Sequence, residues 1–176
     1  MSTGNAGDRV SEKFGSVDPA PAANDTTDVS ELAQRLQDKS VDLPDRFSAL
    51  FALRNMRTDA ADSALATALV TCNDSALLQH EIAYVLGQLQ SGSTVSSLLH
   101  VLQDYSVDDM VRHEAAEALG SIGTEEAMSI LKQHTNDPAY VVRSSIQIAL
   151  DMAAYENNDQ QFNFLTETGK QDSISV

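Results

Sequence analysis

The chain has 176 residues, which suits one domain with tails, because domains average roughly 150 residues. Its 26 acidic and 11 basic residues give a formal net charge of −15, which disfavours binding to nucleic acid and favours a partner that carries basic groups. No apolar run reaches the roughly 18 residues that a membrane span needs, and residues 1–15 lack the apolar core of a signal peptide, so we expect a cytoplasmic protein with no membrane role. The single cysteine, Cys72, excludes an internal disulfide and a Cys-based metal site, which leaves His and carboxylates as candidate metal ligands.

The chain divides into a tail, a domain and a second tail. Residues 1–27 are rich in Ser, Gly, Asp, Ala and Pro without apolar periodicity, so we expect a disordered, linker-like tail. Residues 28–156 carry helical apolar patterns and form the predicted domain. Residues 157–176 resemble the first tail apart from Phe162, Phe164 and Leu165, and we expect them to be mostly disordered.

The predicted domain repeats itself. Four similar helical blocks begin at Phe47, His80, His113 and Ser144, at spacings of 33, 33 and 31 residues. A second helical pattern precedes each block, over Val29–Leu36, Ala61–Val70, Val95–Leu102 and Glu125–Lys132. No stretch shows sustained strand alternation, and turns with capping residues separate the helices. A helix pair every 32 residues or so predicts an all-α fold, an α-solenoid of four repeats.

Two blocks open with the same dipeptide, His80-Glu81 and His113-Glu114. Adjacent packed helices lie roughly 8–10 Å apart, so both imidazoles can reach one ion. Successive residues on a helix point about 100° apart, so Glu81 diverges from His80 and can bridge towards a second ion or a facing subunit. Two His with a carboxylate and open positions suit a non-haem iron(II) oxygenase, although zinc accepts the same donors. The alternative is that each dipeptide is only a polar helix start, but the other two blocks lack it.

Gly87 and Gly120 follow the two histidines by seven residues and return to nearly the same helix face. Glycine inside a helix costs roughly 1 kcal/mol relative to alanine, so something needs the space. Either the glycines clear a channel for a substrate side chain or they allow close helix packing. Tyr84 and Met110 flank the motifs and could line a pocket, but we favour core positions for both.

The block Arg112–Gly120 resembles the HEAT-like repeats of the phycobilisome-lyase type, so the predicted solenoid has four HEAT-like helix-pair repeats. The runs Ala49–Asn55, His80–Leu89 and Met110–Glu114 resemble deoxyhypusine hydroxylases, as do Ser16–Pro21 and Ala149–Met152. The resemblance covers about residues 16–156. That family has two halves with two His-Glu motifs each, whereas this sequence holds one half, which looks like the carboxyl-terminal one.

The resemblance implies a diiron monooxygenase that uses O2 to hydroxylate the deoxyhypusine side chain of eukaryotic translation initiation factor five A, forming hypusine. It implies His80 and His113 as ligands of Fe(2+) and Glu81 as a carboxylate ligand across the interface with a second half, either an amino-terminal half or a second copy. Glu114 stands at the second motif glutamate, as a metal-site residue or a catalytic contact to the substrate. A complete site takes two ions, so we expect the isolated half to be inactive as a monomer. The alternative function is a non-enzymatic HEAT-repeat scaffold that binds a protein partner.

Overall fold

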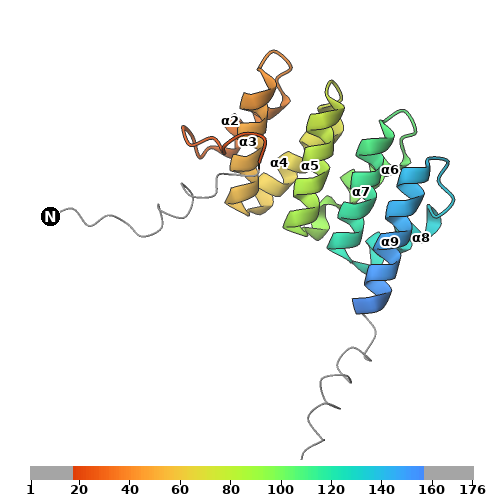
Figure 1. Ribbon diagram of the computed structural model, residues 1–176. Helices are drawn as coiled ribbons and strands as arrows, with labels where there is room; N and C mark the ends of the chain where they lie inside the picture. The colour runs from red at the N-terminus through yellow and green to blue at the C-terminus, as the bar shows by residue number, and fades with distance from the viewer. Residues whose placement is uncertain (1–17, 157–176) are drawn as a thin grey trace, which may run out of the picture.

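The computed structural model describes residues 18–156, and all regular structure in this part of the chain is helical (Figure 1). The elements are α2 (Val29–Gln37), α3 (Leu43–Met56), α4 (Asp59–Thr71), α5 (Ala76–Leu89), the 3-10 helix η1 (Gly92–Thr94), α6 (Val95–Gln103), α7 (Asp109–Ile122), α8 (Glu125–Gln133) and α9 (Tyr140–Glu156). Each of the four predicted preceding helices is found within two residues of its expected bounds. None of the described helices is both long and apolar enough to cross a membrane.

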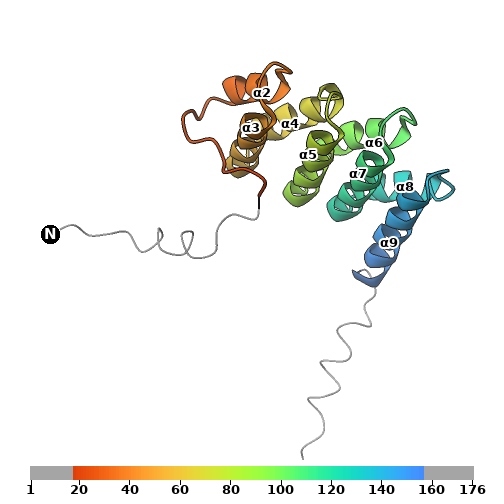
Figure 2. The same ribbon diagram turned by 45° about the horizontal axis from the view of Figure 1, so that its top comes forward.

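The helices form two layers (Figures 1 and 2). One layer holds α3, α5, α7 and α9, which carry the four repeated blocks, and the other holds α2, α4, α6 and α8. Leucines, alanines and other apolar side chains from both layers form one continuous buried core between them. The α-solenoid predicted from the repeat is therefore confirmed.

Polar side chains start most helices. The side chains of Asp28, Thr58, Ser75, Asp108 and Thr124 each accept a hydrogen bond from a backbone N–H in the first turn of the helix that follows. Such caps satisfy N–H groups that have no partner within the helix. Caps of one kind thus recur along the chain and fix where α5 and α7 begin.

A second repeated contact joins the two helices of a pair. The residue before each of the first three blocks donates a hydrogen bond to a carbonyl oxygen at the end of the preceding helix, as Arg46 to Leu36 (2.9 Å), Gln79 to Leu69 (2.9 Å) and Arg112 to Leu102 (3.0 Å). Both buried arginines also pair with an aspartate in the turn of the next repeat, Arg46 with Asp74 and Arg112 with Asp137. These contacts set a common register, so His80 and His113 occupy equivalent places on neighbouring helices.

Residues 18–27 differ from the expectation of a disordered tail, because they lie against α3. Asp18 forms a two-pronged ion pair with Arg54 at 3.0 and 2.9 Å, Ala20 is buried, and the backbone N–H of Ala23 donates to the carbonyl oxygen of Ser48. These contacts join positions far apart in sequence, so local composition does not show them. Residues 1–17 and 157–176, including the tail aromatics, lie outside the described residues.

Candidate metal centre and its neighbouring cleft

The structure brings His80, His113 and Glu114 together between α5 and α7. The two imidazole rings lie 5.6 Å apart between centroids. Glu114 Oε2 lies 3.2 Å from His80 Nε2 and 3.7 Å from His113 Nε2. One ligand atom from each residue lies within 4.8 Å of the other two, and within residues 18–156 this is the one such group of three potential metal ligands. Three of the four predicted metal-site residues therefore converge.

The environment of Glu114 is unusual for a carboxyl group. Its side chain is 9% exposed, and burial together with the charge of Glu117 raises the pKa of Glu114 to about 7, against the lowering influence of His113. Nδ1 of His113 is also buried and lacks a hydrogen-bond partner within the described chain. A cation bound here would favour the charged carboxylate and would use donor atoms that the protein leaves poorly satisfied.

Glu81 lies outside this group of three. Burial is the main cause that raises the pKa of Glu81, and the charges around it include Asp18 and Arg54 from the first repeat. The divergence of about 100° between adjacent helical residues explains why Glu81 does not join His80 as Glu114 does. A role for Glu81 across an interface stays a prediction.

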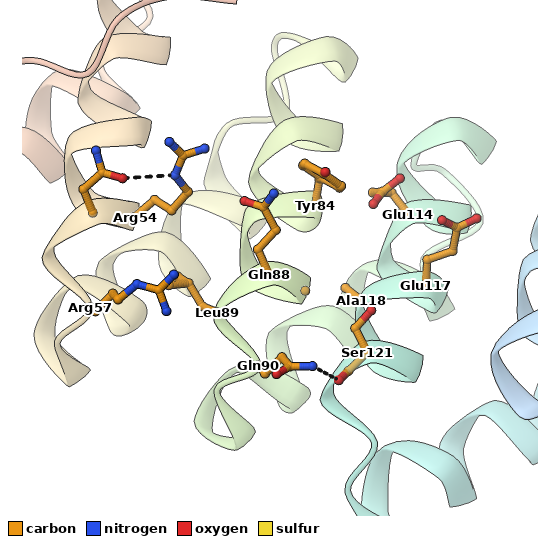
Figure 3. A pocket seen from close by; sticks show the side chains of 12 residues that line it. Arg54, Arg57, Tyr84, Gln88, Leu89, Gln90, Glu114, Glu117, Ala118 and Ser121 are labelled. Atoms are coloured by element: carbon orange, nitrogen blue, oxygen red, sulfur yellow. Dashed lines mark hydrogen bonds between the residues drawn. The ribbon is translucent and has the colours of Figure 1, made fainter. Parts of the chain in front are cut away.

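A cleft of about 680 Å³ lies beside the three-residue group, between the end of α3 and helices α5 and α7 (Figure 3). Arg54 and Arg57 stand on one side, Glu114 and Glu117 on the other, and Tyr84 lies between them (Figure 3). Glu114 therefore belongs to both the metal-ligand group and the cleft. Our preference for a core position was wrong for Tyr84, which is 45% exposed in the cleft.

It was also wrong for Met110, which lies at the exposed start of α7. An exposed residue beside a helix start has no repeat partner to cover it, so periodicity alone does not decide its burial.

The two glycines allow close contact between helices. A Cβ added at Gly87 would lie 3.0 Å from Ala118 Cα, and one added at Gly120 would lie 2.5 Å from Ala149 Cβ. Both distances are shorter than ordinary carbon contacts of about 3.5–4.0 Å. The packing explanation thus has direct support. Gly87 also lines the cleft and Gly120 a separate cavity, and their role in a substrate channel stays a prediction.

The first repeat explains why a cleft is present. Arg54 occupies the position equivalent to Gly87 and Gly120, seven residues into its block. A long side chain there prevents α3 from approaching α5 as closely as α5 approaches α7, and Arg54 instead reaches Asp18. Sequence analysis did not identify Arg54, Arg57 or Glu117 as site residues. The one available signal was the arginine in a position held elsewhere by glycine.

Comparison with known proteins agrees with this architecture. A profile of HEAT repeats matches residues 63–151. The chain belongs to the HEAT-repeat family. It is 49% identical over 150 residues to the deoxyhypusine hydroxylase of Candida albicans, a match that covers 84% of this chain and 46% of that protein. It is 48% identical to the deoxyhypusine hydroxylase of Danio rerio, over 82% of this chain and 47% of that one.

A solved structure of human deoxyhypusine hydroxylase, in complex with glycerol, aligns with a TM-score of 0.75 and 46% identity. The alignment covers 80% of this HEAT-repeat chain and 48% of the human one. The resemblance drawn from the sequence motifs is therefore confirmed. The chain spans about half the length of the deoxyhypusine hydroxylases that it matches.

Proposed function

We propose that the chain is one half, by resemblance the carboxyl-terminal half, of a cytoplasmic deoxyhypusine hydroxylase. The reaction is hydroxylation of the deoxyhypusine side chain of eukaryotic translation initiation factor five A to form hypusine. The observation that carries the proposal is the convergence of His80, His113 and Glu114 in a chain whose relatives are named deoxyhypusine hydroxylase.

The donor set fits iron(II). Nε2 of His80 and Nε2 of His113 would hold the ion, with Glu114 Oε2 as the nearest carboxylate oxygen. Two His and one carboxylate leave coordination positions open, as in non-haem iron oxygenases. Iron bound there would supply the activation of O2 that hydroxylation of a C–H bond requires.

The chain itself would bind and orient the substrate. Glu114 and Glu117 line the cleft beside the histidines, and carboxylates attract the long aminoalkyl cation of deoxyhypusine. A substrate cation would lower the raised pKa of Glu114 and hold its carboxyl group in the charged form. The packed helices α5 and α7 limit access of water from the core side of the group.

A second half would complete the centre. One chain provides one group of two His and a carboxylate, whereas the proposed reaction uses two ions. In a two-fold pair, Glu81 of each copy could reach the ion held by the other, because the same surface serves both copies. An amino-terminal half with its own His-Glu motifs would satisfy the same geometry.

Metal content tests the proposal. His80→Ala and His113→Ala should each abolish stoichiometric iron binding, measured by elemental analysis after desalting, while the circular dichroism of the helices stays nearly unchanged. The matched control is His100→Ala, since His100 is exposed on α6 and outside the group. Iron retained in both site variants contradicts the assignment. A well-folded wild-type chain that binds no iron favours the scaffold alternative.

A further inference from the structure

Arg57 holds a backbone conformation that usually selects glycine. It ends α3 with φ 49° and ψ 51°, in the left-handed region, as Gln90 ends α5 and Gly123 ends α7. These three positions are 33 residues apart, and glycine is the residue with no steric penalty there. The side chain of Gln90 has a structural reason to be present, because its amide donates to the carbonyl oxygen of Ser121 at 2.8 Å.

No such reason exists for Arg57. Its side chain is exposed, lines the cleft, and forms no hydrogen bond or ion pair with any residue in the range 18–156. The other arginines of that range are engaged, by Asp25 for Arg35, Asp74 for Arg46, Asp18 for Arg54, Asp137 for Arg112 and backbone carbonyl oxygens for Arg143. In a chain with a net charge of −15, a free guanidinium at the cleft is positioned to bind an anionic group.

The opposite side of the cleft carries negative charge. Glu117 is exposed to the cleft, and its Oε1 accepts a hydrogen bond from Ser145 Oγ at 2.7 Å, which fixes the carboxylate in place. Tyr84 lies between the two charged sides (Figure 3). The volume of about 680 Å³ is within the range of about 300–1,000 Å³ typical of ligand sites, and it exceeds what a single aminoalkyl chain fills.

We propose that the cleft binds a segment of the substrate protein with two opposite charges, the aminoalkyl group beside Glu117 and a side-chain carboxylate of the same polypeptide at Arg57. This inference rests on the proposed function for the identity of the amine. It adds that Arg57 determines specificity, because it selects a substrate by an acidic residue near the modified side chain.

Synthetic peptides with one deoxyhypusine residue test this assignment. In each peptide of a series, a glutamate stands one to six residues from the modified position, and a matched peptide has glutamine there. Binding to the iron-loaded chain is measured by fluorescence anisotropy. We expect wild type to bind the best glutamate peptide about fivefold more tightly than its glutamine partner, the range for a partly exposed ion pair.

Arg57→Gly should abolish this preference without changing the affinity for the glutamine peptide, and Arg57→Lys should retain part of it. Glycine suits the left-handed backbone, so Arg57→Gly should fold at least as well as wild type, checked by thermal unfolding. The control is Lys132→Gln, which removes one positive charge from the exposed face of α8 and should leave the preference intact.

Equal affinity of wild type for both peptides across the series overturns the inference, as does an Arg57→Gly variant that weakens both equally. A loss of pairing between halves in Arg57→Gly, measured as mass in solution, also overturns it, since Arg57 would then be an interface residue. If the iron-loaded chain binds none of the peptides, the cleft is not the substrate site. Iron content and hydroxylation assess the proposed function separately.

Discussion

Gly120→Ala tests the packing that holds the solenoid together. The new methyl group would lie 2.5 Å from Ala149 Cβ and 3.3 Å from its Cα, so α7 and α9 would have to separate by roughly 1 Å to restore carbon contacts of about 3.5–4.0 Å. Overpacking of this kind costs about 1–3 kcal/mol. Replacing glycine by alanine within a helix returns about 1 kcal/mol. The net expectation is a loss of about 1 kcal/mol in the free energy of unfolding, or a melting temperature lower by about 2–4 °C.

Gly87→Ala should behave differently. Its methyl group would lie 3.0 Å from Ala118 Cα, a smaller overlap that the helix propensity of alanine nearly offsets. However, α5 and α7 are the helices that carry His80 and His113, so their separation should lower iron affinity by about tenfold, the effect typical of changes around a metal site. Gly120→Ala should leave iron affinity unchanged, because α9 carries none of the three ligands.

Thermal unfolding and iron titration of both variants are the assays. Gly92→Ala is the control, because its methyl group would lie no closer than 3.7 Å to another residue, Thr124. The double variant Gly120→Ala with Ala149→Gly keeps one methyl group at the contact, so its stability should return to within about 0.5 kcal/mol of wild type. A Gly120→Ala protein as stable as wild type, or a Gly87→Ala protein with wild-type iron affinity, would refute this account of the glycines.

Three further predictions concern a buried ion pair, pH and assembly. Arg112→Gln should cost about 3–5 kcal/mol because it leaves the fully buried Asp137 unpaired, whereas Arg46→Gln should cost less because Asp74 is 27% exposed; urea unfolding compares the two. Since the pKa of Glu114 is raised from 4.5 to about 7 in the fold, the metal-free chain takes up a proton on folding in this window, and its contribution to stability should fall as pH rises from about 4.5 to 7. Glu114→Gln should lack that contribution, seen as a difference in unfolding free energy between the two proteins across pH. The isolated chain should not hydroxylate as a monomer, so activity measured against chain concentration should appear only with a dimer or an added second half; turnover proportional to concentration in a demonstrably monomeric sample would argue against a shared site.

The repeat in the sequence was sufficient to predict the fold. Blocks 33 residues apart each need a neighbour to bury their apolar faces, so the pattern predicts helix pairs stacked in a solenoid. The same spacing predicted that His80 and His113 lie on neighbouring helices, and the structure places their rings 5.6 Å apart. Periodicity is a strong signal because it is read over the whole domain.

Only the tertiary structure decided which carboxylate lies nearest the two histidines. Glu81 and Glu114 hold the same place in their blocks, yet Glu114 is flanked by α5 on one side and α9 on the other, whereas Glu81 faces the first repeat, where Arg54 replaces the glycine and Asp18 approaches from the amino-terminal segment. The repeat treats both glutamates alike because it records positions within a block and not the neighbours of that block. The sequence by itself therefore determined the helices, their order and the register of the histidines, while the position of Glu114, the docking of residues 18–27 and the charged cleft depend on contacts between residues far apart in the chain.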